Sequence, residues 1–190
     1  MLLLVGLGNP GPNSENNRHN IGFKIIDAIN SHFKLSKQKP KFKGLLTTGS
    51  IDSKKVYAIK PLTFMNNSGT AIKELIDYFK IDAKDVIVFH DDLDIDFGKV
   101  KAKVGGTSAG HNGIKSIDKF IGTDYSRVRV GIGHPKEAKR VNSHVLEDFK
   151  DDEEEKIKEI TENIVKLIPT LIERKIDLFS SKVNQNLNGI

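Results

Sequence analysis

Two short apolar runs, each ending at turn-forming or polar residues, constrain the fold of this chain more than any other feature. The first run, Leu2–Leu7, leads into a loop rich in glycine and proline, and the second, Val86–Phe89, stops at His90, Asp91 and Asp92. A short apolar run bounded by such residues is typical of a strand buried on both faces. Ligands bind at the carboxyl ends of such strands in parallel sheets. The residues that follow the two runs are therefore candidate site residues.

The rest of the chain alternates between helical and strand patterns. Helices are expected at 21–33, at 68–79 with Ser68 as the N-cap, at 112–121, at 151–168 and from Pro169 to about Phe179. Strands are expected in a hairpin around 44–60 and in alternating segments at 98–104 and 125–132. This order predicts an α/β protein with a twisted mixed sheet flanked by helices, in a single domain of residues 1–180. The polar residues 181–190 are expected to form a frayed tail.

Composition excludes several chemistries and favours one kind of partner. The 190 residues contain no cysteine, so a disulfide scaffold, a thiolate nucleophile and a cysteine-ligated metal are ruled out. The net charge is +5, but residues 147–162 hold nine acids and three lysines, which leaves 27 basic and 16 acidic residues elsewhere. A basic body of this kind attracts polyanions. The N-terminal apolar run is too short for a membrane span or a signal peptide, so a cytoplasmic protein without a membrane partner is expected.

Two glycine-rich motifs suggest activities that their surroundings disfavour. Gly6–Gly11 matches a dinucleotide-binding motif, but prolines interrupt the segment where the helix of such a site would begin. Gly106–Gly110 matches the motif of serine esterases, with Ser108 as the nucleophile and Asp124 and His144 in the right chain order. The strand before this motif carries three lysines on one face, whereas a nucleophile of this type follows a buried strand. A serine esterase stays as the alternative function.

Polar residues at strand ends and helix starts supply another candidate site. His19 precedes the first expected helix, and its imidazole is a natural general base near pH 7. Asp91 could orient this histidine, although the acids of 91–96 could also bind magnesium or form a solvated turn. Asn9, Asn66 and Asn112 lie at loop or strand–helix junctions. They could hold a water and a carbonyl through neutral hydrogen bonds, or act as turn and cap residues.

Six sequence blocks in a fixed order make the chain similar to bacterial peptidyl-tRNA hydrolases. The blocks cover the chain to about residue 150 and are Val5–Gly11, Arg18–Gly22, Pro61–Gly69, His90–Asp94, Gly110–Gly113 and Arg127–Pro135. The resemblance implies an enzyme that hydrolyses the ester between a peptide and the 3′ ribose of tRNA, so that the tRNA returns to translation. It also implies a monomer without metal or cofactor, whose partner is the acceptor stem and 3′ end of peptidyl-tRNA.

The resemblance also assigns roles to individual residues. His19 would activate the water, Asp91 would orient His19, and Asn9 would complete the catalytic group. Substrate-binding roles in the cleft would fall to five residues, namely Phe64, Met65, Asn66, His111 and Asn112. Ser14 departs from the family, which usually has a tyrosine at this place.

Lys103 and Arg129 match the pair that binds the 5′-phosphate of the tRNA in this family. The residue pattern agrees, because both lie on the polar faces of alternating strands, beside Lys99, Lys101 and Arg127. Phosphate contacts position a nucleic acid without reading its sequence. A module that binds RNA without catalysis remains a third hypothesis.

Overall fold

Seven strands form one mixed sheet in the computed structural model, which describes residues 1–189. In chain order the strands are β1 (Leu2–Gly6), β2 (Lys39–Lys41), β3 (Gly44–Ile51), β4 (Lys54–Pro61), β5 (Val86–Asp92), β6 (Val100–Val104) and β7 (Ser126–Gly131). In the sheet their order is β2-β3-β4-β1-β5-β7-β6. Strands β4, β1, β5 and β7 are parallel, whereas β3 pairs antiparallel with β4 and β6 pairs antiparallel with β7. The expected mixed sheet and hairpin are confirmed.

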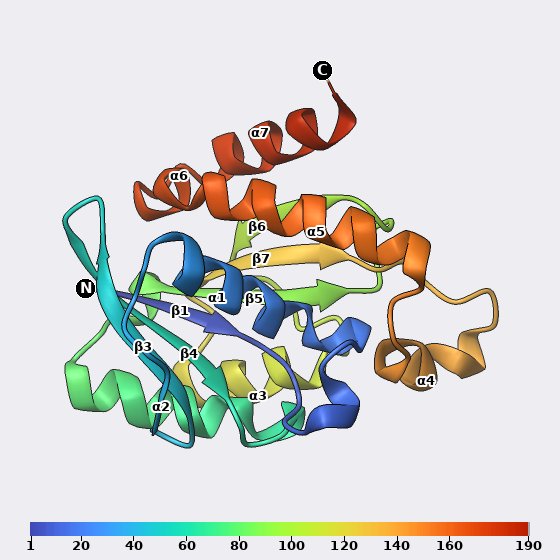
Figure 1. The fold of residues 1–190 in the computed structure, drawn as a ribbon. Helices are drawn as coiled ribbons and strands as arrows, with labels where there is room; N and C mark the ends of the chain where they lie inside the picture. The colour runs from blue at the N-terminus through green and yellow to red at the C-terminus, as the bar shows by residue number, and fades with distance from the viewer. Residues whose placement is uncertain (190) are drawn as a thin grey trace.

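Helices cover both faces of this sheet (Figure 1). They are α1 (Ile21–His32), α2 (Ser68–Phe79), α3 (Asn112–Ile121), α4 (Val141–Leu146), α5 (Asp151–Lys166), α6 (Ile168–Ile172) and α7 (Ile176–Asn188). One apolar core lies between the sheet and α1, α5, α6 and α7, and the other lies between the sheet and α2 and α3. The alternation of side chains along β1 supplies both cores, since Leu2 and Leu4 face the first and Leu3 and Val5 the second. The predicted α/β class is therefore confirmed.

The helix α1 begins unusually close to the sheet, and glycine makes this possible. A Cβ atom on Gly22 would overlap backbone atoms of Leu7 and Phe89, and one on Gly6 would overlap the carbonyl of Gly22. The start of α1 therefore packs directly on the carboxyl ends of β1 and β5. This contact places the short 3₁₀ turn Arg18–Asn20 beside the carboxyl end of β5, where Asp91 is the penultimate residue.

The C-terminal residues correct two expectations. The helix predicted for 151–168 ends at Lys166, and the chain turns at Leu167 into α6. The residues expected to fray after 180 instead continue α7 to Asn188, and residue 190 lies outside the described residues. The polar side chains that suggested a tail pair with the edge strand β6: Ser180 Oγ accepts from the amide of Ala102 at 2.8 Å, and Asn184 bonds both the amide and the carbonyl of Val100.

Two smaller observations complete the fold. Ser68 is not the N-cap of α2 but its first residue, and its hydroxyl donates to the carbonyl of Met65 at 2.8 Å. Among residues 1–189, every helix is too short or too polar to span a bilayer.

Candidate active site

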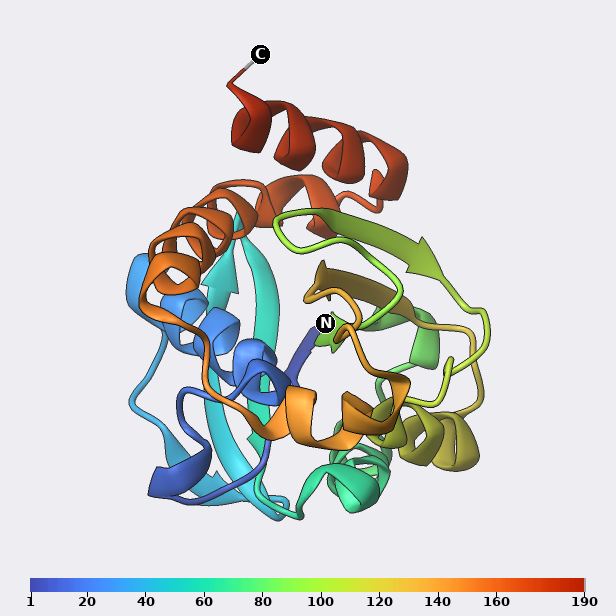
Figure 2. The ribbon, with the colours of Figure 1, turned by 90° about the vertical axis from the view of Figure 1, so that its right-hand side faces the viewer.

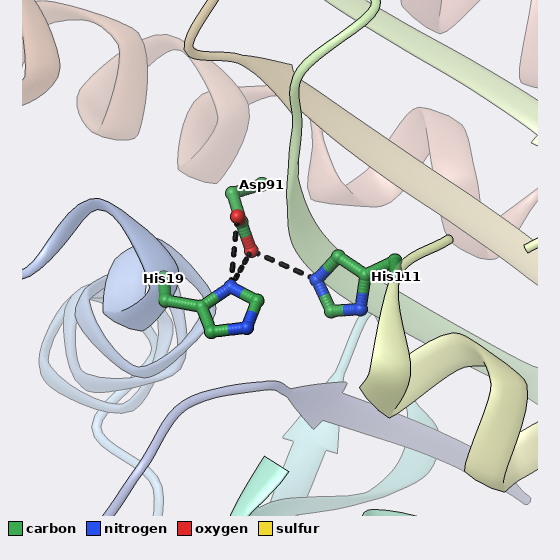
Figure 3. Close-up of side chains that lie close together, drawn as sticks. All are labelled: His19, Asp91 and His111. Atoms are coloured by element: carbon green, nitrogen blue, oxygen red, sulfur yellow. Dashed lines mark hydrogen bonds and ion pairs between the residues drawn. The ribbon is translucent and has the colours of Figure 1, made fainter. Parts of the chain in front are cut away.

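His19, Asp91 and His111 form a hydrogen-bonded group at the carboxyl end of β5 (Figure 3). His19 Nδ1 lies 2.9 Å and 2.8 Å from the two carboxylate oxygens of Asp91, and His111 Nε2 lies 2.9 Å from Oδ1. The 3₁₀ turn before α1, the strand β5 and the loop before α3 each supply one member. The structure thus brings together His19 and Asp91, two of the three predicted catalytic residues, and adds His111 to the same carboxylate.

Burial and charge act in opposite directions on this group. Burial lowers the pKa of His19, but the negative charge and hydrogen bonds of Asp91 raise it by more, so the net shift is upward from 6.5. Burial alone would raise the pKa of Asp91, yet the two histidines hold it well below its usual range. Asp91 is therefore a carboxylate at neutral pH, which donates nothing and accepts from both histidines. Because Nδ1 of His19 donates to it, Nε2 is left as the basic nitrogen.

His111 is fixed in one tautomer by the helix that follows it. Its Nδ1 accepts from the backbone amides of Gly113 at 3.1 Å and Ile114 at 3.3 Å, and so caps α3. An accepting Nδ1 carries no proton, so the proton of the neutral ring sits on Nε2 and faces Asp91. The ring of His90 lies under that of His111 at 4.9 Å. His90 is buried in its neutral form, because burial lowers its pKa to about 3.

The loop after β1 is locked by paired amides. The backbone N–H of Asn9 donates to the side-chain oxygen of Asn20, and the Asn20 amide donates to the carbonyl of Asn9, both at 2.9 Å. Asn9 Oδ1 accepts from the amide of Met65 at 2.8 Å. Its Nδ2 group has no hydrogen-bond partner within residues 1–189, so its hydrogens are available as donors. Asn20, the residue after His19, thus fixes the backbone of Asn9, which is a predicted site residue.

A hollow opens beside the base. His19, Asp91, His111 and Asn112 line it together with the glycine-rich loop after β6, and α4 closes its other side. Figure 2 looks onto this edge of the sheet and shows α4 in orange beside the blue loop after β1. Asn66 and Phe64 are exposed near the buried Met65, and the φ angle of Phe64 is 60°. A positive φ is costly for an aromatic residue, so the turn holds Phe64 out against local strain.

Arg18 fastens α4 to the turn that carries His19. It is buried, and its guanidinium donates to the carbonyls of His144 and Glu147 and to the carboxylate of Glu153 at 2.9 Å. Arg18 therefore connects Glu153, in the acidic first turn of α5, to the turn that carries His19. At least one of the acidic residues of 147–162, Glu153, therefore has a structural role, because it binds Arg18.

The two predicted phosphate-binding residues lie on neighbouring strands. Lys103 is paired in register with Arg127, and Arg129 with Lys101, so Lys103 and Arg129 are diagonal neighbours on one face. Burial together with the positive charges of Arg129 and Arg127 lowers the pKa of Lys103. Arg129 Nε donates to Asp92 Oδ2 at 2.8 Å. Cations that repel one another in this way favour an anion between them.

Arg127 was expected on the exposed polar face of its strand, but the structure buries it. It is 1% exposed, and its guanidinium donates to the carbonyls of Gly106 and Thr107 and to Asp118 Oδ1 at 2.9 Å. Tyr125 donates to the same carboxylate oxygen at 2.7 Å. Strand alternation sorts residues by face and does not reveal that the glycine-rich loop covers this one. Arg127 therefore anchors the loop and is not a surface charge.

The serine esterase alternative does not fit this architecture. The strand before Gly106–Gly110 is β6, which lies at the edge of the sheet and runs antiparallel to β7, whereas the elbow of a serine esterase follows a buried parallel strand. His144 Nε2 lies 3.3 Å from the carbonyl of Ile132. Within residues 1–189, no hydrogen bond joins the Ser108 side chain to a histidine or an acid.

His19, Asp91 and His111 are also the candidate metal ligands of the described chain, since their donor atoms lie within 4.8 Å of one another. These atoms already bond to one another at 2.8–2.9 Å. A metal ion would have to replace those hydrogen bonds and the proton on His111 Nε2. The geometry therefore favours a hydrogen-bonded cluster of side chains over a metal site.

Sequence reasoning missed three residues of this site, namely Asn20, Arg18 and Asp92. The amide pair of Asn20 and Asn9 had a signal, because both residues fall in the motifs that flank the first loop. Arg18 had none, since its partners lie more than 120 residues away. Asp92 was visible as an acid at a strand end, but its partner depends on which strand neighbours β5.

The chain is similar to known proteins over nearly its whole length. The profile of the family described as peptidyl-tRNA hydrolase matches residues 3–189. The peptidyl-tRNA hydrolase of Pelagibacter ubique is 72% identical over 184 residues, which cover 97% of this chain and 99% of that protein. That of Bartonella henselae is 47% identical over 189 residues, covering 100% and 98%. The crystal structure of peptidyl-tRNA hydrolase from Acinetobacter baumannii matches with a TM-score of 0.91 at 31% identity, covering 97% of this chain and 94% of that one.

Proposed function

The chain belongs to the peptidyl-tRNA hydrolase family, and on that premise we propose that His19 and Asp91 carry out its reaction. The enzyme hydrolyses the ester that joins a peptide to the 3′ ribose of tRNA and releases free tRNA. The observation that carries the assignment of residues is the hydrogen bond between His19 Nδ1 and Asp91, which leaves Nε2 free beside the hollow.

His19 Nε2 takes a proton from water as the water attacks the ester carbonyl. Asp91 stabilises the imidazolium that forms, and this is the role that a buried carboxylate has beside a general base. The tetrahedral intermediate then expels the ribose 3′ oxygen, which receives the proton from His19. The products are the peptide with a free carboxyl group and tRNA with a free 3′ hydroxyl.

Neutral amides hold the reacting carbonyl in this proposal. Asn9 Nδ2 is a free donor because its oxygen is bound by Met65 N–H, so we assign it to the carbonyl oxygen, where negative charge develops. Asn112 lines the hollow beside His19, Asn9 lies in a second groove together with Asn20, and Asn66 is exposed beside Met65. These two are assigned to the water and the 3′ adenosine, with Phe64 and Met65 as apolar neighbours of the substrate.

Lys103 and Arg129 are assigned to the 5′-phosphate of the tRNA acceptor stem. Their diagonal placement on β6 and β7 supports this assignment, because two cations on one face can bind a single phosphate. All groups of the site come from one chain, which supports action as a monomer. The substrate arises during translation, so we place the activity in the cytoplasm.

Cleavage of an N-acetylated aminoacyl-tRNA in the presence of a chelator tests the proposal. Native protein should release both tRNA and the acetylated amino acid, and His19→Ala should lose about 10²–10⁴-fold in rate, the usual contribution of a general base. Ser108→Ala should turn over at a rate close to that of the native protein. An inactive Ser108→Ala together with an active His19→Ala would instead favour the serine esterase.

A further inference from the structure

Two adjacent acids at the end of β5 point to opposite faces of the sheet. Side chains alternate along a strand, so Asp91 lies on the side of Phe89 and the α1 core, whereas Asp92 lies on the side of Val88 and the α3 core. Asp91 holds the catalytic base. Asp92 is buried as well, at 9% exposure, and it is not part of the reaction described above.

Asp92 is held rigidly and in turn holds Arg129. Its Oδ1 accepts from the backbone amide of Asp94 at 2.8 Å, which fixes the carboxylate in the turn after β5. Its Oδ2 accepts from Arg129 Nε at 2.8 Å. The Arg129 side chain is 19% exposed, so this ion pair is partly shielded from water and from salt.

This contact leaves the phosphate-binding end of Arg129 free. A guanidinium has five N–H donors, and Asp92 uses the one on Nε. Neither terminal nitrogen of Arg129 has a hydrogen-bond partner within residues 1–189. The two terminal NH₂ groups form the fork that binds phosphate in bidentate geometry. The carboxylate also offsets the repulsion between Arg129 and Lys103, which lie on the same face of neighbouring strands.

We propose that Asp92 is a positioning residue that orients Arg129 for the 5′-phosphate of the tRNA. The proposal rests on the assignment of Lys103 and Arg129 to that phosphate. It follows that one turn of chain aligns the two ends of the substrate, since Asp91 aligns the base with the ester while Asp92 aligns the guanidinium with the phosphate. Asp92 itself does not contact the reacting atoms.

The experiment compares one N-acetylated aminoacyl-tRNA with a 5′-phosphate and the same substrate with a 5′-hydroxyl. Native protein should show a lower KM for the phosphorylated substrate, by about tenfold for one bidentate contact. Asp92→Asn should lose most of this preference through KM, with a smaller change in kcat. Arg129→Ala should lose it as well, and Asp92→Asn/Arg129→Ala should be no worse than Arg129→Ala, because Asp92 acts through Arg129.

Asp94→Asn is the matched control. It removes the same charge from the same turn, but Asp94 is more than half exposed and pairs with His134, so the preference for phosphate should remain. If Asp92→Asn is too unstable to assay, Asp92→Glu replaces it; the added methylene displaces the carboxylate, and the preference should fall in part.

Each remaining outcome has one meaning. A folded Asp92→Asn or Asp92→Glu that keeps the full preference overturns the role of Asp92 and leaves the phosphate assignment intact. A native protein without any preference overturns the phosphate assignment and, with it, the role of Asp92. Equal losses in Asp94→Asn and Asp92→Asn would show a general effect of charge instead of positioning.

Discussion

His111 donates its Nε2 hydrogen to Asp91 at 2.9 Å, so it shares the Asp91 carboxylate with His19. The same ring caps α3 through Nδ1. A single side chain thus connects the start of α3 to the buried carboxylate of Asp91. Its two ring nitrogens have different roles, since Nδ1 stabilises the start of α3 and Nε2 donates to a buried charge.

Substitutions of His111 should separate these two contributions. His111→Ala removes the cap and one hydrogen bond to a buried carboxylate, so the free energy of unfolding should fall by about 2–4 kcal/mol. His111→Asn keeps a side chain that can cap α3, and it should recover about 1 kcal/mol of that loss. Urea unfolding measures both. Equal stabilities of His111→Ala and native protein would refute the structural role of this ring.

Arg127 should matter for stability although it lies on a strand beside Lys103 and Arg129, the residues proposed to bind phosphate. Arg127→Met leaves the Asp118 carboxylate and two loop carbonyls without their donor, and loss of one partner of a buried ion pair costs about 3–5 kcal/mol. Lys115→Met, on the exposed face of α3, is the control and should change stability by less than about 0.5 kcal/mol. A near-native unfolding midpoint for Arg127→Met in urea would argue against the anchor.

The contribution of Lys103 to tRNA affinity should depend on the salt concentration. A lysine that contacts one phosphate contributes roughly one unit to the slope of log affinity against log salt concentration. Lys103→Ala should therefore bind tRNA more weakly at low salt and with a slope shallower by about one. Lys99→Ala is the comparison, because Lys99 lies just before β6 and pairs with Asp96. An unchanged slope in Lys103→Ala would count against a phosphate contact.

The buried neutral His90 should make the fold sensitive to acid. An unfolded chain protonates this histidine below about 6.5, whereas the folded protein resists protonation down to about 3. The unfolded state thus binds more protons between these values, so stability falls as the pH falls, by at most about 1.4 kcal/mol per pH unit from this group. His90→Leu should have a flatter dependence of unfolding free energy on pH between those limits. Parallel curves for the two proteins would contradict this account.

Local patterns in the sequence marked His19 and Asp91 as candidate site residues. Asp91 is the first acid after an apolar run that is typical of a buried strand, and His19 precedes a helix with a clear apolar face. The topology then had to bring them together, and the glycine at position 22 allows the close packing that does so. The resemblance to a family named the same residues from their motifs.

Predictions that concerned long-range contacts were weaker. Arg127 was expected beside the surface cations, because alternation along β7 does not tell which face a loop covers. Residues after 180 were expected to fray, because Ser180 and Asn184 are polar and their partners on β6 lie about 80 residues away. In both cases a polar side chain pairs with backbone groups of a distant segment, and nothing in the local sequence marks such pairing.

The dependence of the single-turnover rate on pH, compared between native protein and Asp91→Asn, tests the role of His19 most directly. After subtraction of uncatalysed ester hydrolysis, the native rate constant should rise with pH through one ionisation above 6.5, because the base must be neutral and Asp91 raises its pKa. In Asp91→Asn burial acts unopposed on the pKa of His19, so the midpoint should move to lower pH while the rate falls by about 10²–10⁴-fold. A native rate constant that is independent of pH from about 5.5 to 8.5, or an identical midpoint in the two proteins, would contradict His19 as a base held by Asp91.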